Sequence, residues 1–414
     1  DAAYATGDVV SGVEAVRNIQ RHCLPLIQRY GLPRKSTAGR PGPATNEDVR
    51  AWSRELRLLA ENQALPGLPP AASIIIPVHN QIRFTLACLH SLYLNAGRQD
   101  FEILIADDAS SDQTREVFTE RFPRLRYLRS DENLGFLRTC NRAAREARGR
   151  HIVLLNNDTV VLPGWLSELL RTFDEHPGTG LAGSKLLYPE GALQEAGGIV
   201  FEDGGAWNYG RLEDPADPRF GFARDADYCS GASVAVDAEL WRRLGGFDER
   251  FAPAYYEDTD LAFKVRAAGR RVIYQPCSEV VHFEGVSNGT SEASGVKRHQ
   301  ALNKTAFRTK WAGILAGFGP CDPLALPVLR GVKRRILVVD STTPTPDKDS
   351  GSIDACNLMR IFQDLGFHVT FLPESCCHGG RATEDLQRAG VECLYAPWTP
   401  SPRTRASRST SGCS

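Results

Sequence analysis

The chain contains two stretches that decide its fold, Ser73-Ile-Ile-Ile-Pro-Val-His-Asn80 and Phe101-Glu-Ile-Leu-Ile-Ala-Asp-Asp108. Each begins as a short apolar run typical of a buried strand and ends in polar residues. Two more apolar runs, Arg124–Arg129 and His151–Leu155, follow with amphipathic segments between them. This alternation predicts an α/β domain with a mainly parallel sheet over residues 71–315.

Composition excludes several classes of protein. The chain has 414 residues, with 49 Lys and Arg against 50 Asp and Glu, so its net charge of −1 gives no footprint for nucleic-acid binding. No apolar run approaches the roughly 18 residues of a membrane span. The 11 cysteines form no CxxC pair and no metal-finger spacing. We expect reduced thiols and a cytoplasmic protein rather than a secreted one.

The remaining chain divides at composition changes. Residues 1–70 carry helical patterning at Val9, Val13 and Val16, then a Gly/Pro-rich break at 39–43 and a second predicted helix over Glu47–Glu61. Residues 316–333 are predicted to be a linker. Residues 334–399 begin a second α/β unit with too few residues to complete it, and residues 400–414 are predicted to be disordered. Because the chain starts at Asp1, we expect it to be a fragment.

Helices are predicted between the strands of the main domain. Ser110–Gln113 is typical of a capping box before a helix over Gln113–Phe122. Pro163–Glu175 has apolar residues on one face, with Pro near its start and Gly178 beyond its end, so it predicts another helix.

Polar residues follow three strands of the predicted sheet, where ligands bind in open α/β proteins. They are Pro77-Val-His79-Asn80 after the first strand, Asp107-Asp108-Ala-Ser-Ser-Asp112 after the second and Asn156-Asn157-Asp158 after the fourth. Any one of these groups could simply cap the next helix. Their coincidence after three strands predicts a binding site at that edge.

Asp158 has no obvious ion-pair partner in the nearby sequence. A carboxylate in that place suits Mg²⁺ or Mn²⁺ together with a diphosphate, because both ions prefer oxygen ligands. The alternative is a turn residue that caps the helix near Pro163.

Two further segments carry candidate catalytic groups. Glu257 and Asp258 fall at the start of a helix that ends at Gly269, where they could complement the helix dipole or supply a general base. His282 follows an apolar run, and taken alone such a histidine is more often a core residue than a ligand.

Taken together, these segments resemble the family 2 glycosyltransferases, which have the GT-A fold. The resemblance covers residues 71–290 and rests on Ile74-Ile-Ile-Pro77-Val-His-Asn80, Ile105-Ala-Asp107-Asp108-Ala-Ser-Ser-Asp112, Asn133-Leu-Gly135-Phe136, Leu154-Leu-Asn156-Asn-Asp158-Thr159, Gly231-Ala-Ser233, Gly245-Gly-Phe-Asp248-Glu249, Glu257-Asp258-Thr-Asp260-Leu261 and His282. Within that family the chain is most similar to bacterial rhamnosyltransferase-like enzymes. The segment Ile336–Pro373 resembles the start of a family 4 glycosyltransferase of GT-B fold.

The resemblance implies a GT-A, Rossmann-like nucleotide-diphospho-sugar transferase domain and a role for each matching residue. Those implied to bind the nucleotide sugar are Pro77, His79, Asn80, Asp107, Asp108, Asn133, Gly135, Asn156 and Asn157. Asp158 and His282 would hold the metal, Mn²⁺ or Mg²⁺, with Asn156 in place of the first acid of the family's metal motif. Asp258 matches the catalytic base and Glu257 its acidic neighbour.

The implied activity is inverting transfer of one sugar from a nucleoside-diphosphate sugar to a hydroxyl of a glycan or lipid-linked glycan acceptor, in O-antigen-like surface polysaccharide synthesis. The motif of processive polymerases is missing, which favours transfer of a single sugar. Gly231 is a candidate on the acceptor side, and so are Trp207 and Tyr209, which could stack on a sugar or form the core of a lid. Membrane contact would be peripheral.

Two rival functions stay open at this stage. A nucleotidyltransferase would need a glycine-rich phosphate loop after its first strand, and Pro77-Val-His-Asn80 supplies none. The other is a catalytically impaired sugar-nucleotide-binding module within a multi-domain assembly, favoured by the single acid of the metal motif.

Overall fold

The computed structural model describes residues 17–35, 42, 44–61, 69–97, 99–120, 122, 125–284, 298–322 and 328–398. The helix expected around Val9 to Val16 and the tail predicted at 400–414 lie outside these residues. Within them, no helix is both long and apolar enough to cross a lipid bilayer.

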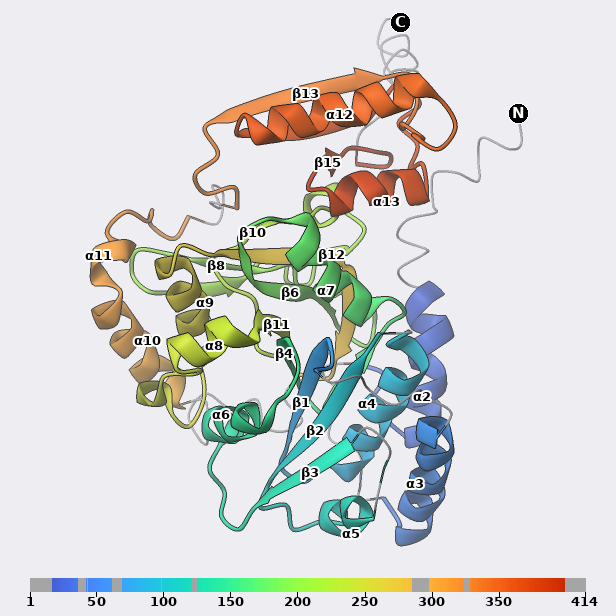
Figure 1. Ribbon diagram of the computed structural model, residues 1–414, viewed down its shortest axis with the longest axis vertical. Helices are drawn as coiled ribbons and strands as arrows, with labels where there is room; N and C mark the ends of the chain where they lie inside the picture. Colours follow the sequence, from blue (N-terminus) through green and yellow to red (C-terminus); the bar gives the residue numbers. More distant parts are fainter. Residues whose placement is uncertain are drawn as a thin grey trace, which may run out of the picture.

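A large twisted sheet forms the centre of the molecule (Figure 1). Its strands, in spatial order, are β10 (Arg224–Asp225), β12 (Arg271–His282), β6 (Thr179–Leu187), β11 (Ser233–Asp237), β4 (His151–Leu155), β1 (Ala72–Val78), β2 (Phe101–Asp108) and β3 (Leu125–Ser130), with β5 (Thr159–Val161) on β12 and β7 (Leu193–Glu195) on β6. The pairs β4–β1–β2–β3 and β6–β12 are parallel, and β11 joins the two blocks in antiparallel orientation. The predicted fold class, mixed α/β with a mainly parallel, Rossmann-like sheet, is confirmed.

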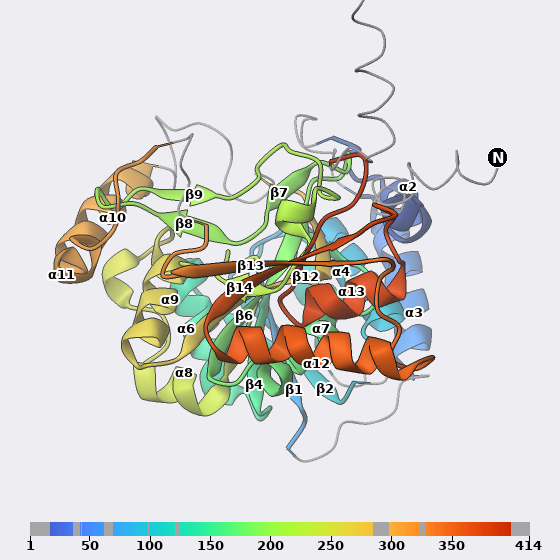
Figure 2. The same ribbon diagram turned by 90° about the horizontal axis from the view of Figure 1, so that it is seen from above.

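Helices cover both faces of this sheet (Figures 1 and 2). One side carries α4 (Ile82–Asn95) and α7 (Trp165–Glu175), and the other carries α6 (Phe136–Glu146), α8 (Ala238–Leu244) and α9 (Glu257–Ala267). Every residue of β1 and β2 is buried as a result, which explains their continuous apolar runs.

Helix α5 (Thr114–Thr119) is shorter than predicted. The predicted capping box does not form, because the Gln113 side chain makes no cap. Instead Asp112 Oδ1 accepts from the Thr114 N–H at 3.0 Å and Asp112 Oδ2 accepts from the Ile82 N–H at 2.9 Å. The Asp112 carboxylate therefore accepts a hydrogen bond from the first residue of both α4 and α5.

The N-terminal helices pack on the main domain and share its core. They are a π-helical turn at Ile19–Cys23, α2 (Leu24–Tyr30) and α3 (Asn46–Glu61). The Tyr30 hydroxyl bonds the His90 Nδ1 of α4 at 2.8 Å, and Arg83 Nη1 donates to the Tyr30 carbonyl at 3.0 Å. The helices α2 and α3 thus form a layer on α4.

Helices α10 (Arg298–Lys310) and α11 (Ala312–Leu315) lie against α9. The Phe263 ring meets Phe307 with centroids 4.9 Å apart and Trp311 with centroids 5.6 Å apart. This aromatic contact positions the helix that begins with Glu257 and Asp258.

The second α/β unit is a parallel sheet of β13 (Arg334–Asp340), β14 (Phe367–Pro373) and β15 (Glu392–Cys393) with α12 (Ser350–Asp364) and α13 (Arg381–Arg388). Its core gathers around Met359, Val369 and Phe371. The side chains of Leu337 on β13 and Leu365 beyond α12 stay 56% and 59% exposed. Apolar side chains of this unit therefore remain exposed, and the incomplete domain expected from the sequence stays a prediction.

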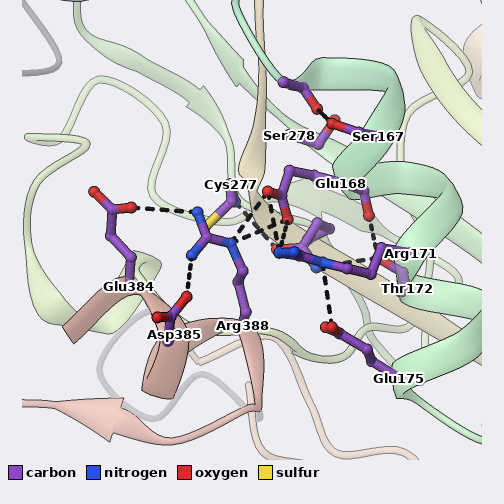
Figure 3. A network of polar contacts seen from close by, with 12 residues as sticks. Ser167, Glu168, Arg171, Thr172, Glu175, Cys277, Ser278, Glu384, Asp385 and Arg388 are labelled. Carbon is purple, nitrogen blue, oxygen red and sulfur yellow. Dashed lines mark hydrogen bonds and ion pairs between the residues drawn. The ribbon is translucent and has the colours of Figure 1, made fainter. Parts of the chain in front are cut away.

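This unit docks on the main domain through α13. Arg388 Nε lies 3.1 Å from Glu168 Oε2 of α7, as Figure 3 shows, and the Arg388 carbonyl bonds His176 Nε2 at 2.8 Å. The Tyr395 hydroxyl donates to the Ala216 carbonyl at 2.9 Å. A cavity of about 1540 Å³ lies between the two units. No predicted site residue lines this cavity, and acids pair with several of its arginines, including Asp227 with Arg266 and Arg330.

Candidate active site

The sheet register brings the predicted nucleotide-side residues together. Val78 at the end of β1 lies beside Asp107 of β2, so the two following loops leave the sheet at the same edge. The His79 ring is exposed there, and its Nδ1 bonds the Asp108 carbonyl at 2.7 Å. Asn133 Nδ2 lies 3.4 Å from His79 Nε2.

Asp108 anchors the loop that contains Gly135. Its two oxygens accept from the Leu134 N–H at 2.7 Å and from the Gly135 N–H at 2.9 Å. Gly135 has a φ of +79°, and a Cβ there would lie 3.1 Å from Pro253, so the turn requires glycine.

Asp107 faces the interior instead. It is fully buried and bonded by Tyr127 at 2.5 Å, Arg129 at 2.5 Å and the Ser110 N–H at 2.9 Å. Burial alone would raise the pKa of Asp107, but these hydrogen bonds outweigh it and leave the pKa lowered. The structure therefore places Asp107 as a support of the loop, with Asp108 nearer the binding edge.

Asn80 and Asn157 also support loops. Asn80 has a φ of +61°, and its Oδ1 accepts from the Ser111 N–H at 2.7 Å. Asn157 is buried, and its Nδ2 donates to Thr85 Oγ1 at 3.0 Å. Asn156, beside it, donates its backbone N–H to the Ala232 carbonyl at 3.0 Å. This bond places the residues that follow β4 next to the turn before β11.

Asp158 and His282 face each other across the sheet edge. Strand β5 pairs with β12 so that Thr159 lies opposite His282, and His282 Nε2 is 3.3 Å from Asp158 Oδ1. Burial alone would lower the pKa of His282, but the Asp158 carboxylate, together with the charges of Glu284 and Glu195, outweighs burial and the pKa is raised.

The residues present fit a divalent cation. His282 Nδ1 lies 2.9 Å from Gln194 Oε1, and Gln194 Nε2 donates to Glu284 at 3.3 Å, which fixes the amide with its oxygen toward the ring. Gln194 Oε1 can only accept, so His282 Nδ1 carries a proton and Nε2 is the nitrogen that faces the Asp158 oxygen. In the charged ring Nε2 donates a proton to Asp158, in keeping with the raised pKa of His282. In the neutral ring the Nε2 lone pair and the Asp158 oxygen form an imidazole–carboxylate pair that suits Mn²⁺. Among the described residues no group of three or more His, Cys, Asp or Glu forms a metal cluster.

The first turn of α9 is held in a strained setting. Tyr255 and Tyr256, just before it, have φ of +73° and +70°, a region that non-glycine residues rarely adopt. Asn303 of α10 holds this segment, because its Nδ2 lies 2.9 Å from the Phe251 carbonyl and 3.0 Å from the Tyr255 carbonyl.

Asp258 projects from this turn toward residue 231. Its Oδ2 accepts from the Gly231 N–H at 3.0 Å and its Oδ1 from the Thr259 N–H at 2.7 Å. Burial raises the pKa of Asp258, and these backbone hydrogen bonds offset part of the rise. A partly exposed carboxylate with a raised pKa is suited to accept a proton.

Glu257 is buried, and its Oε2 has no hydrogen-bond partner within the described residues. Burial and the charge of Asp258 raise the pKa of Glu257 well above its ordinary value. The shift favours the protonated form of Glu257 beside Asp258.

Glu195 is a member of the site that the sequence did not reveal. It is 1% exposed, its Oε1 accepts from the Ser230 N–H at 2.8 Å, and its Oε2 has no partner in the described chain. Burial raises the pKa of Glu195 to about 8; the charge of Asp258 adds to the rise, and that of His282 opposes it. Because both charges act on Glu195, it links the Asp158–His282 pair to Asp258.

Asp260 has a structural role in anchoring α9. Its carboxylate, fully buried, lies 2.7 Å from Lys310 Nζ and accepts from Trp311 Nε1 at 2.7 Å. The Lys310-Trp311 pair therefore anchors α9 just behind Asp258.

The two aromatic candidates on the acceptor side differ in their exposure to solvent. Tyr209 is buried against Phe220, with ring centroids 5.0 Å apart, which fits the core interpretation. Trp207 on β9 (Ala206–Asn208) is 42% exposed and contacts Phe201 edge to face. Only Trp207 keeps a face free for a ligand.

The fold is a mixed α/β domain with a mainly parallel, Rossmann-like sheet, and comparison with known proteins indicates its class. Residues 73–224 match the model of the family described as Glycosyl transferase family 2. The match supports a family 2 glycosyltransferase domain in this part of the chain, whose sheet agrees with the GT-A type. The family 4 segment after residue 335 stays a prediction.

Particular relatives can be named. The O-antigen biosynthesis protein RfbC of Myxococcus xanthus is 33% identical over 308 residues, which are 69% of this chain and 23% of RfbC. The N-acetylglucosaminyl-diphospho-decaprenol L-rhamnosyltransferase of Mycobacterium tuberculosis is 28% identical over 56% of this chain and 81% of its own length. The chain thus spans about a quarter of RfbC. Among solved structures, GalNAc-T7 with UDP, GalNAc and Mn²⁺ aligns with a TM-score of 0.45 and 15% identity, over 58% of this chain and 53% of that one.

Proposed function

We propose that the chain is an inverting, metal-dependent glycosyltransferase that moves one sugar from a nucleoside-diphosphate sugar to a hydroxyl of a glycan or glycolipid acceptor. The observation that carries this proposal is the Asp158–His282 pair, whose facing oxygen and nitrogen lie 3.3 Å apart. The family match and the relatives named above support glycosyl transfer and polysaccharide synthesis.

On the donor side, the exposed His79 ring offers a face for the base, and Asn80, Asn133 and Gly135 shape the loops around it. Asp158 and His282 would hold Mn²⁺ or Mg²⁺. When bound, the cation supplies positive charge for the diphosphate leaving group.

On the acceptor side, Asp258 is the general base. It accepts the proton of the acceptor hydroxyl while that oxygen forms its bond to the anomeric carbon, and the nucleoside diphosphate leaves from the opposite face. The N–H groups of Gly231 and Thr259 hold the carboxylate in place for this step. The raised pKa of Glu257 favours its neutral form, which adds no second negative charge beside Asp258.

The acceptor is proposed to be linked to a lipid diphosphate, because the mycobacterial relative is named for such an acceptor. The chain would then work in the cytoplasm with peripheral contact to the membrane. Exposed Trp207 is the proposed stacking surface for an acceptor sugar.

A second candidate is a sugar-nucleotide-binding module with impaired catalysis. It is favoured by Asn156, which leaves one carboxylate at the metal motif. Hydrolysis of a sugar nucleotide distinguishes the two, because a binding module shifts its melting temperature with the nucleotide but releases no sugar.

The test is a thermal-shift panel of UDP, dTDP and GDP with and without Mn²⁺, followed by donor hydrolysis. We expect a Mn²⁺-dependent shift for one base and slow Mn²⁺-dependent hydrolysis of its sugar nucleotide. Asp158→Asn should abolish both. A shift that is independent of Mn²⁺ and survives Asp158→Asn would contradict the proposal.

A further inference from the structure

Strand β7 carries two adjacent polar residues in a buried position. Gln194 is 2% and Glu195 is 1% exposed, and β7 pairs with β6 through Leu186 opposite Glu195. Burying an amide and a carboxyl is costly unless both find partners. The partners that they find belong to opposite halves of the proposed active site.

Gln194 sets the orientation of the His282 ring. Its Oε1 accepts from His282 Nδ1 at 2.9 Å, and its own Nε2 is held by Glu284, which also accepts from the Tyr188 hydroxyl at 2.8 Å. Nδ1 therefore carries a proton, and Nε2 is the nitrogen that faces Asp158, with a lone pair available to a metal ion when the ring is neutral. Groups of this kind behind a metal-binding histidine orient the ring and fix its tautomer.

Glu195 holds in place the turn that contains Gly231. The Ser230 N–H donates to Glu195 Oε1 at 2.8 Å, and the next N–H, that of Gly231, donates to Asp258 Oδ2 at 3.0 Å. Two carboxyl groups from different segments therefore hold consecutive N–H groups of one turn. Displacement of the Ser230 N–H would move the donor that fixes Asp258.

We propose that Gln194 and Glu195 are positioning residues, and that this one short strand aligns the His282 ring with Asp158 and the Ser230–Gly231 turn with Asp258. The effect of these two residues on catalysis rests on the proposed function. The tautomer of His282 and the stability of the Ser230–Gly231 turn can be measured without turnover.

The first test concerns Gln194→Leu, which keeps the size of the side chain and removes the acceptor. The control is Gln275→Leu, because Gln275 is equally buried and donates to Thr172 at 3.0 Å, away from the site. Nitrogen-15 NMR of labelled histidines, with His282→Ala to assign the signal, reports the tautomer. At a pH at which the His282 ring is neutral, we expect the Nδ1-protonated form in the parent and in Gln275→Leu, and a mixture of tautomers in Gln194→Leu.

The second readout is Mn²⁺ binding in the presence of UDP or dTDP, which is measured by the loss of the EPR signal of free Mn²⁺. Gln194→Leu should weaken it about 10–100-fold, the usual effect of removing such a partner. An unchanged tautomer together with unchanged Mn²⁺ affinity would overturn the Gln194 part.

The second test compares Glu195→Ala with Glu195→Gln, which keeps an oxygen for the Ser230 N–H. Hydrogen exchange of residues 230–232 should accelerate in Glu195→Ala only, and donor hydrolysis should fall about 10–100-fold in kcat with little change in KM. Parent-like exchange in Glu195→Ala would overturn the Glu195 part. If the parent hydrolyses no donor, the proposed function fails while the exchange and tautomer results still decide the positioning roles.

Discussion

The Gly231 backbone N–H donates to Asp258 Oδ2 at 3.0 Å and so joins the turn before β11 to the first turn of α9. A Cβ at Gly231 would lie 3.5 Å from the Asp258 Cβ, so the turn passes close to the carboxylate. Asp258 is thereby fixed from a separate segment of the chain, which a proton acceptor needs if it is to meet a bound hydroxyl in one orientation.

Asp258→Asn should lower kcat for sugar transfer or donor hydrolysis about 10²–10⁴-fold, because loss of a general base typically costs that much. Binding of the nucleoside diphosphate, measured by thermal shift, should stay unchanged. The matched control is Glu257→Gln, which resembles the protonated Glu257 side chain and should leave the melting temperature near that of the parent. Parallel loss of binding and turnover in Asp258→Asn would indicate a structural role.

Glu195 should make stability depend on pH. Its pKa is about 8 in the folded protein against an ordinary 4.5, so between these values the folded state holds a proton that the unfolded state has released. The free energy of unfolding of the parent should therefore fall, relative to Glu195→Gln, by about 1.4 kcal/mol for each pH unit between roughly 4.5 and 8.

Urea unfolding of both proteins at several pH values measures this difference. Below pH 4.5 and above pH 8 the difference should level off. A difference that is flat across the whole range would show that Glu195 titrates normally in the folded protein.

Asn303→Ala should loosen the start of α9. The Asn303 amide donates to the carbonyls of Phe251, Ala254 and Tyr255, and the backbone at Tyr255 has a φ of +73°. Removing these bonds from buried carbonyls should cost about 1–3 kcal/mol and lower kcat for donor hydrolysis, with nucleotide binding retained. Thr305→Ala on the exposed side of the same helix is the control. Full activity in Asn303→Ala would show that the strained turn does not depend on this side chain.

The sequence predicted the strand ends of the site well, because apolar runs that end in Asp or Asn have a clear local pattern. Ser73–Pro77, Phe101–Ala106 and His151–Leu155 lie within or match β1, β2 and β4. The pairing of Asp158 with His282 came from the family resemblance, and the register of β5 on β12 explains it physically.

Other parts of the site depend on long-range register that no local pattern reveals. Gln194 and Glu195 lie in a strand of three residues, too short for an alternation to indicate which face is buried. Asn303 lies in a polar helix far along the chain. The sequence could not separate the inward Asp107 from Asp108 either, since alternate residues of a strand face opposite sides but the buried side is set by packing.

Arg388 should hold the second α/β unit on the main domain. Its side chain is 16% exposed and its Nε lies 3.1 Å from Glu168, whose side chain is 12% exposed, so Arg388→Ala leaves a largely buried carboxylate whose remaining ion-pair partner among the described residues is Arg171 at 3.4 Å. Loss of one partner of a buried ion pair costs about 3–5 kcal/mol, and the partial exposure of this pair places it toward the lower end. Because the pair crosses between α13 and α7, the loss should appear as faster hydrogen exchange in both helices. Arg381→Ala is the control on the same helix, since that side chain is 91% exposed and 3.9 Å from Asp385. If exchange in α7 stays at the parent rate in Arg388→Ala, docking depends instead on backbone contacts such as the Ala223 N–H to the Gln387 carbonyl at 2.9 Å.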